Sequence, residues 1–397
     1  MLPKNTKVVV IGGGIAGCSC AYHLAKFGWK DVILLERDQL TSGTTWHAAG
    51  LVSQLGPTAA ITKIRKYTTD LYKQLEKKID FSAGLKLNGA LSIATTKGRW
   101  QELKRQATTA QLFDVNVEVL NINQIKKIYP VINEKDILGG IFMPGDGQAD
   151  PIGVTNLLAK AAKQLGVKIF EATKANKIEP GKSIRINTDD GCIQAETLVL
   201  AGNAYIGGLN KKLRRMIMPA SSCIIATEPM SAERSNDVIP SDMAVCDLNT
   251  ILDYYRLSPD KRMLFGGRFN YSGIEPSPDK IRTEIRKRMI KVFPDLDDLA
   301  IDYAWSGNVA VTINRIPQLG RLSENIYYSQ GYSGHGVAPT HMAAKIISSG
   351  ILKEWDMIDT LSKVKHIQLP GGKWFSSPAM SIGMAYYRLK DFLASKS

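Results

Sequence analysis

Three glycines close to the start of the chain have the spacing of a phosphate-binding turn. Gly12, Gly14 and Gly17 follow an apolar run that begins at Val8. Where a buried strand turns sharply into a helix, the first glycine permits the turn, the second lets a pyrophosphate approach the backbone, and the third lets the helix pack closely on the strand. The positive end of that helix faces the phosphates. We therefore predict a dinucleotide site that includes Gly12, Gly14, Ile15, Ala16 and Gly17.

A carboxylate follows at the end of the second apolar run, residues 32–35. In dinucleotide-binding folds, an acidic residue in this place hydrogen-bonds the ribose 2′-hydroxyl. Glu36 therefore favours FAD or NAD and argues against a cofactor that carries a 2′-phosphate. We expect Glu36 and its neighbour Arg37 at the adenosine end of the cofactor.

The composition is that of an ordinary globular protein that contains more than one core. The chain has 397 residues, of which 44% are hydrophobic and 22% are charged, and this length favours two interleaved domains. The uncharged stretch 8–25 is long enough to resemble a membrane helix, but its three glycines and its polar residues argue against that reading. We do not expect a signal peptide, which needs a basic start, an apolar run and a small-residue cleavage site, because its removal here would destroy the glycine turn. We expect a cytoplasmic protein without an integral membrane segment.

The net charge of +14 is compatible with nucleic acid, an anionic surface, an acidic substrate or only a lysine-rich proteome. The basic cluster 282–291 contains Ile281, Ile285 and Met289 at helical spacing, which favours a solvated helix face over a binding patch. No RNA-binding motif accompanies the charge, so we expect no nucleic-acid partner. The five cysteines lack metal-ligand spacing, and we predict reduced thiols and no metal site.

The order of the predicted elements indicates an α/β fold. Helices are expected at 57–79, 99–112, 151–165 and 339–351, and strands at 167–170, 197–202 and 326–329, with hairpin signals at 258–260 and 265–267 after a strand-rich segment begins near Pro219. This order predicts a Rossmann-like FAD-binding domain interleaved with a mostly antiparallel β-sheet substrate domain, an α/β arrangement that is α+β overall. The expected FAD-binding domain comprises 1–80, 145–218 and 325–397, and the expected substrate-binding domain comprises 81–144 and 219–324.

Residues 41–51, Thr-Ser-Gly-Thr-Thr-Trp-His-Ala-Ala-Gly-Leu, resemble the flavin loop of dimethylglycine and sarcosine dehydrogenases. In those enzymes the histidine of this motif carries FAD covalently through the 8α carbon, which implies the same for His47; the alternative is that His47 only packs or hydrogen-bonds beside the flavin. A neutral imidazole is the nucleophile that such a bond requires. The resemblance assigns to the cofactor Gly43, Thr44, Thr45, Trp46, His47, Ala49, Gly50 and Leu51.

The second half of the chain resembles gamma-glutamylputrescine oxidase. The resemblance rests on the segments 253–257, 264–267, 301–307, 315–320 and 328–336 and on two tail motifs, 369–374 and 386–391. Both relatives are D-amino-acid oxidase-like flavoproteins, in which the segment that corresponds to 331–339 runs beneath the flavin pyrimidine ring and the next helix points its start at the C2 carbonyl. The resemblance adds the cofactor residues Ala175, Ala201, Gly202, Gly307, Gly331, Tyr332, Ser333, Gly334, His335, Gly336 and Val337.

Aromatic and basic residues of the second half are the candidates for contact with a substrate. The rings of Tyr254, Tyr255 and Trp305 are suited to hold an alkylammonium by cation–π attraction, or else to pack in a sheet. Strand alternation places Tyr254 and Arg256 on one face and Tyr255 on the other, so both tyrosines line one cavity only if the strand bends. Arg256 is the first candidate to pair with a substrate carboxylate, and Arg315 and Arg268 are weaker candidates. His335 is a candidate donor to flavin or substrate, or a structural residue of its loop.

These features predict an FAD-dependent amine oxidoreductase that transfers hydride from the carbon beside a primary or secondary amine to flavin N5, after which water hydrolyses the imine. The expected substrate is a small amine or amino acid that carries a carboxylate, and the acceptor is oxygen or an electron carrier. The alternative is an N-methyl amino acid demethylase of the dimethylglycine or sarcosine type. A NAD-dependent dehydrogenase and an RNA-acting flavoprotein are the alternatives from other classes.

Overall fold

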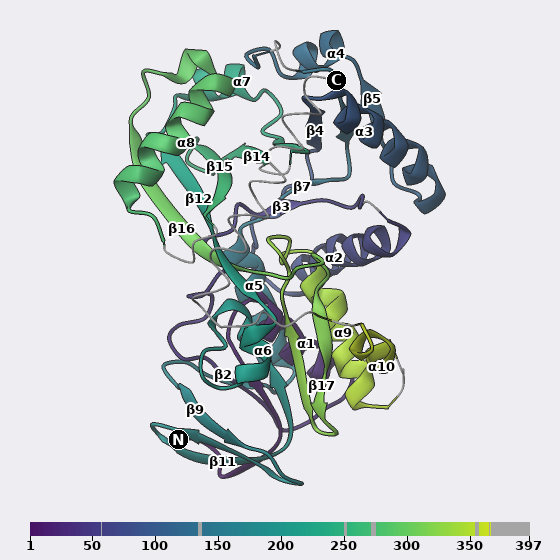
Figure 1. Ribbon diagram of the computed structural model, residues 1–397, viewed down its shortest axis with the longest axis vertical. Helices are drawn as coiled ribbons and strands as arrows, with labels where there is room; N and C mark the ends of the chain where they lie inside the picture. Colours follow the sequence, from purple (N-terminus) through teal and green to yellow (C-terminus); the bar gives the residue numbers. More distant parts are fainter. Residues whose placement is uncertain are drawn as a thin grey trace.

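A computed structural model of the chain describes residues 1–56, 58–133, 137–249, 252–270, 275–353, 357–364 and 366, with only the backbone at 268–270. Figure 1 shows an elongated molecule with two lobes, each built around a sheet, and long strands that run from one lobe toward the other. The tail motifs predicted at 369–374 and 386–391, and the side chain of Arg268, lie outside this description.

The first sheet contains the predicted dinucleotide-binding strands. Its order is β17-β18-β11-β1-β2-β8, and β10 and β9 continue from β11. Strand β1 pairs in parallel with β2 and β11, as expected for a doubly wound fold. The strands of this sheet are β1 (Asn5–Ile11), β2 (Val32–Leu35), β8 (Lys168–Phe170), β9 (Ala175–Glu179), β10 (Ile184–Thr188), β11 (Gly191–Leu200), β17 (Gln318–Ser323) and β18 (Ile326–Gln330).

Both faces of this sheet are covered, which explains why its strands read as continuous apolar runs. Val8 and Val10 pack with helices α1 (Ile15–Lys26), α2 (Ala59–Lys78), α5 (Pro151–Gln164), α9 (Pro339–Ile351) and α10 (Met357–Ser362). Val9 and Ile11 face the other side, where they pack with β10 and with α6 (Lys211–Arg215). The predicted strand, turn and helix at the start of the chain are confirmed, and α9 has the predicted bounds.

The second sheet has the order β16-β12-β15-β14-β13-β4-β6-β5. Its strand pairs are antiparallel except for β13 with β4, so the predicted mostly antiparallel sheet is present. Its strands are β4 (Ala90–Ala94), β5 (Glu118–Leu120), β6 (Gly139–Met143), β12 (Met218–Thr227), β13 (Ala244–Asp247), β14 (Asp253–Leu257), β15 (Met263–Asn270) and β16 (Ile301–Val311).

Helix α8 (Pro278–Val292) covers one face of the second sheet (Figure 1). Its buried residues are Ile281, Ile285 and Met289, as the sequence spacing predicts. The remaining helices of the second lobe are α3 (Lys97–Ala110), α4 (Ile122–Ile128) and α7 (Ala232–Val238). A short pair, β3 (Leu51–Val52) with β7 (Gly147–Gln148), and 3₁₀ turns at Gln111–Phe113, Asn203–Tyr205 and Pro294–Leu296 complete the described elements.

One of the two predicted hairpins is wrong. The signal at 258–260 does mark the connection of β14 to β15, but Gly266 and Gly267 lie inside β15. A Cβ atom at Gly266 would lie 2.1 Å from Cε2 of Tyr254, so this glycine lets a ring lie against the strand and does not make a turn. Among the described residues, no helix combines the length and the apolar character that crossing a bilayer requires.

Candidate active site

A cavity of about 1450 Å³ is lined by residues of both sheets. It extends from Glu36 and Lys174 at one end, past Gly12 and Ile15, to Tyr254 and residues of α3. A pocket for one drug-sized ligand has about 300 to 1,000 Å³. The cavity is therefore large enough for an extended cofactor with a second molecule beside it.

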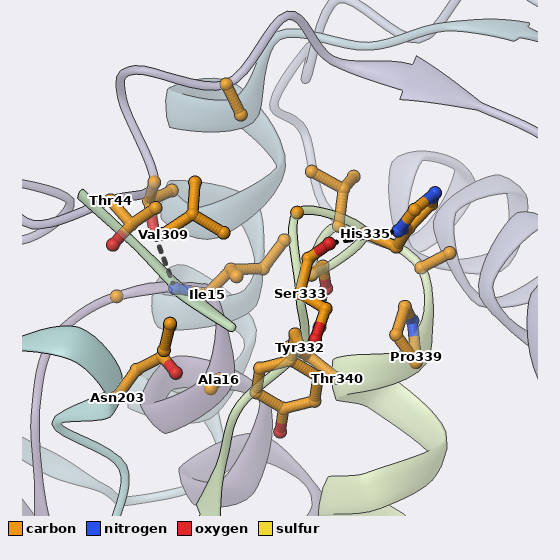
Figure 2. Close-up of a pocket in the computed structure, with 18 of the residues that line it drawn as sticks. Ile15, Ala16, Thr44, Asn203, Val309, Tyr332, Ser333, His335, Pro339 and Thr340 are labelled. Carbon is orange, nitrogen blue, oxygen red and sulfur yellow. Dashed lines mark hydrogen bonds between the residues drawn. The ribbon is translucent and has the colours of Figure 1, made fainter. Parts of the chain in front are cut away.

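The glycine turn forms one wall of the cavity. Gly12 has φ +114°, and a Cβ atom there would lie 2.8 Å from the carbonyl oxygen of Ala201. Helix α1 starts after Gly14 without a side-chain cap, and Thr45 Oγ1 accepts a hydrogen bond from the backbone N–H of Ile15 at 3.1 Å (Figure 2). The positive end of α1 therefore faces the cavity, as an anion site requires.

Glu36 is held in place by the same turn. Its Oε2 accepts a hydrogen bond from the backbone N–H of Gly13 at 2.5 Å, and its Oε1 accepts one from the backbone N–H of Asp38 at 2.9 Å. The carboxylate thus lies beside the phosphate turn, where it is available to ribose hydroxyls. Arg37 also lines the cavity, and its guanidinium pairs with Asp38 at 2.8 Å.

The loop that contains His47 borders the cavity on the side of β16. His47 Nδ1 lies 2.9 Å from the carbonyl oxygen of Gly43. A carbonyl can only accept, so Nδ1 carries the proton and the neutral ring has its lone pair on Nε2. Burial lowers the pKa of His47, which favours this neutral form. Gly307 lies against the ring: a Cβ atom there would be 2.4 Å from Cβ of His47.

The segment from Tyr332 to Thr340 forms the opposite wall (Figure 2). Gly331, Ser333 and Gly334 have φ values of +74°, +52° and +90°, so the loop reverses sharply before α9. Helix α9 begins at Pro339, which is pre-organised for a first helical position, and its start has no side-chain cap. The helix start therefore brings partial positive charge to the cavity.

Three basic side chains line the cavity in or near this wall. Arg65 of α2, Arg315 and His335 all line the cavity. Burial, followed by the nearby charge of Arg65, lowers the pKa of His335 to about 4, and Arg315 acts in the same direction. His335 is therefore neutral at neutral pH, and the charges of both arginines favour that form. Arg65 is anchored through Nη1 to Ser53 Oγ at 3.0 Å and to the Leu55 carbonyl at 2.5 Å.

Most of the predicted site residues are brought together in this one cavity. Three predicted cofactor residues, Gly17, Trp46 and Gly331, do not line it. A Cβ atom at Gly17 would lie 1.7 Å from the Gly12 carbonyl oxygen, so Gly17 serves the packing of α1 on β1. The predicted residues that line the cavity are Gly12, Gly14, Ile15, Ala16, Glu36, Arg37, Gly43, Thr44, Thr45, His47, Ala49, Gly50, Leu51, Ala175, Ala201, Gly202, Tyr254, Gly307, Tyr332, Ser333, Gly334, His335, Gly336 and Val337.

Three predicted substrate residues lie elsewhere. The ring of Tyr255 is 1% exposed and stacks on Phe265 in the core of the second lobe, because alternation turns it away from the cavity. Arg256 donates to the carbonyl oxygens of Ala49 at 2.5 Å and Leu257 at 3.0 Å, so its guanidinium supports the flavin loop instead of lining the cavity. Trp305 donates to the His47 carbonyl at 3.4 Å and does not line the cavity either.

Arg65 and Asp146 are cavity residues that the sequence analysis missed. Asp146 is fully buried, its Oδ1 accepts from the backbone N–H of Gln54 at 2.8 Å, and burial raises its pKa to about 7. Arg65 follows Ile61 by four positions in the predicted helix 57–79, and both line the cavity. An arginine in the apolar stripe of a helix is the signal that could have revealed it.

The geometry fits an extended adenine dinucleotide. Gly12 and Gly14 leave a cradle that a Cβ atom would narrow, Glu36 lies beside the glycine turn, and residues at the starts of α1 and α9 line the cavity. The fold and the site together define a dinucleotide-dependent oxidoreductase.

Comparison with known proteins specifies the family. A profile of FAD dependent oxidoreductases matches residues 7–349, and the chain belongs to this family, whose cofactor is FAD. Gamma-glutamylputrescine oxidoreductase of Escherichia coli is 31% identical over 403 residues, which cover 97% of this chain and 93% of the relative. The 4-methylaminobutanoate oxidase (formaldehyde-forming) of Paenarthrobacter nicotinovorans is 37% identical over 378 residues, 89% of this chain and 43% of the relative.

Two further similarities agree with this assignment. Human mitochondrial sarcosine dehydrogenase is 40% identical over 190 residues, which cover 48% of this chain and 20% of that protein. The crystal structure of L-proline dehydrogenase from P. horikoshii superposes with a TM-score of 0.80 at 24% identity and covers 96% of this chain and 99% of that chain. The structural similarity establishes the fold, and the predicted superfamily is confirmed.

Proposed function

We propose that this flavoprotein oxidises the carbon beside a primary or secondary amine in a small molecule that also carries a carboxylate. The observation that carries the proposal is that two arginines, Arg65 and Arg315, line the same cavity as neutral His335 and that the charges of both lower its pKa. Guanidinium groups recognise carboxylates through paired hydrogen bonds. These two arginines take the role that the sequence analysis gave first to Arg256.

We assign a different role in this reaction to each of the groups that line the cavity. The isoalloxazine ring, when bound, supplies the acceptor for the hydride that leaves the carbon beside nitrogen. Arg65 and Arg315 hold the substrate carboxylate and so orient the amine. His335, which is neutral, accepts a hydrogen bond on Nε2 from the substrate nitrogen and positions the unprotonated amine, whose lone pair forms the imine. Water then hydrolyses the imine to a carbonyl compound and ammonia, or an amine where the substrate is a secondary amine.

The relatives named above support this substrate class, and they also support a second candidate. The names of the 4-methylaminobutanoate oxidase and of sarcosine dehydrogenase indicate N-methylated substrates for those proteins. The loop 41–51 of this chain resembles that of the N-demethylating enzymes. An N-methyl amino acid demethylase is therefore the second candidate, with oxygen or an electron carrier as the acceptor.

Anaerobic reduction of the bound flavin tests the proposal. We expect the visible absorption band of the oxidised enzyme to bleach when gamma-glutamylputrescine or an N-methyl amino acid is added without oxygen. Faster bleaching by one set of substrates chooses between the two candidates. An amine of matched length without a carboxylate is the control, and we expect it to react far more slowly. Failure of both substrate sets to bleach the flavin would contradict the proposal.

The His47→Ala variant tests covalent attachment of FAD. The lone pair on Nε2 of His47 gives the loop a neutral nucleophile beside the cavity. We therefore expect flavin absorbance to remain with the denatured wild-type chain and to separate from the variant on gel filtration in denaturant. His366, another described histidine that does not line the cavity, supplies the control variant His366→Ala. Release of FAD from denatured wild-type protein would show that His47 only packs beside the ring.

A further inference from the structure

A buried polar network lies behind the loop that precedes α9. Ser19 of α1, Thr68 and Tyr72 of α2, and His341 of α9 are all 0% exposed. None of them lines the cavity. Burying polar groups costs free energy unless they are hydrogen-bonded. A buried network of this size between three helices therefore indicates a function beyond packing.

The network joins the loop to α1 and α2. The hydroxyl of Tyr72 donates to the carbonyl oxygen of Val337 at 3.1 Å and lies 2.6 Å from Nε2 of His341. Nδ1 of His341 lies 2.9 Å from the hydroxyl of Ser19. Burial lowers the pKa of His341 to about 3, so the ring is neutral.

A second anchor holds the next carbonyl of the same loop. The hydroxyl of Thr68 donates to the carbonyl oxygen of Ala338. Thr68 and Tyr72 are four residues apart on α2 and so share one face of the helix. Two consecutive carbonyls, those of Val337 and Ala338, are thus turned toward α2. Both residues line the cavity, and Pro339, the first residue of α9, follows directly.

We propose that Tyr72, with His341 behind it, and Thr68 are positioning residues that hold the start of α9 against the flavin site and thereby set the reduction potential of the bound FAD. A helix start carries partial positive charge and stabilises the negative charge of a reduced flavin. Carbonyl oxygens carry the opposite partial charge. Holding two of them on the α2 side keeps that negative charge away from the cavity.

The test is the midpoint potential of the FAD-loaded enzyme, measured by equilibration with a redox dye in the absence of substrate. In Tyr72→Phe and in Thr68→Val a loop carbonyl loses its side-chain donor. We expect the ratio of reduced to oxidised flavin at a fixed potential to fall at least tenfold, which corresponds to a shift of about 30 mV for a two-electron couple. Thr68→Ser keeps the hydroxyl and is expected to retain the wild-type potential.

Tyr67→Phe is the matched control for a loss of stability. The hydroxyl of Tyr67 lies 2.7 Å from Nε2 of His23, whose Nδ1 lies 2.7 Å from the carbonyl oxygen of Ser19, so it is connected to α1 and not to the loop carbonyls. Its removal lowers stability without touching the carbonyls of Val337 and Ala338, so we expect an unchanged potential. Thr68→Val decides the question alone if Tyr72→Phe does not retain flavin.

A wild-type potential in Thr68→Val, or an equal shift in Tyr67→Phe, would overturn the inference. The potential is measured without an amine. Its outcome is therefore independent of whether the proposed substrate class is right.

Discussion

The Gly17→Ala variant is expected to lose its bound flavin and to unfold at a markedly lower temperature than the wild type. A Cβ atom at this position would lie 1.7 Å from the backbone carbonyl oxygen of Gly12. A backbone atom cannot move aside as a flexible side chain can, so α1 must separate from β1. Overpacking of a core costs about 1 to 3 kcal/mol and sometimes more, and we expect a loss of about 3 kcal/mol or more here.

Thermal unfolding and the visible spectrum of the purified protein measure this effect. Gly98→Ala is the matched control, because Gly98 lies in the first turn of α3 with nothing within 4 Å of an added Cβ atom. We expect that variant to stay yellow and to be as stable as the wild type or up to about 1 kcal/mol more stable. Retention of flavin by Gly17→Ala would mean that the turn does not need the close contact of helix and strand.

The Arg65→Met variant is expected to lose most of its activity toward carboxylate-bearing amines while it keeps FAD. Removing one partner of a buried, hydrogen-bonded charge pair costs about 2 to 5 kcal/mol. If Arg65 holds the substrate carboxylate, this cost lowers kcat/KM by roughly 30- to 5,000-fold. With an amine that lacks a carboxylate, the flavin of the variant should bleach nearly as fast as the flavin of the wild type does with that amine. That substrate has no carboxylate to pair with Arg65.

The ratio of the rates with the two amines separates a loss of carboxylate binding from damage to the protein structure. Arg65 also supports the backbone at Leu55, and damage there would slow both substrates alike. Lys63→Met makes the same change of charge at an exposed position of α2 and should leave both rates unchanged. Equal losses of rate in Arg65→Met for amines with and without a carboxylate would show that Arg65 does not bind the carboxylate, and would leave Arg315 or another residue as its partner.

The sequence predicts the nucleotide end of the site well because its signals are local. The glycine turn, the buried strand that precedes it and Glu36 lie within the first 36 residues, and each has a direct geometric reason. The alternation of Tyr254 and Tyr255 also correctly predicts that only one of them reaches the cavity. These inferences require the period of a single strand or helix and no knowledge of distant contacts.

The substrate end is predicted less well because it depends on contacts between distant segments. Arg256 has the chemistry of a carboxylate ligand, but the loop at Ala49 folds over it and occupies its donors. Strand β13 pairs in parallel with β4, and no periodic pattern in the sequence predicts this pairing. Arg65 of α2 and His335 of the segment before α9 likewise line one cavity, a proximity that neither segment reveals alone.

The order of the strands in the first sheet has a consequence for how the enzyme acquires its cofactor during synthesis. Strand β18 and the loop of His335 are synthesised more than 300 residues after strand β1. At about 5 to 20 residues per second, roughly 17 to 70 seconds separate them. A nascent chain thus exposes the glycine turn long before the later segment that lines the same cavity exists, so we expect stable loading with FAD to await synthesis of that segment.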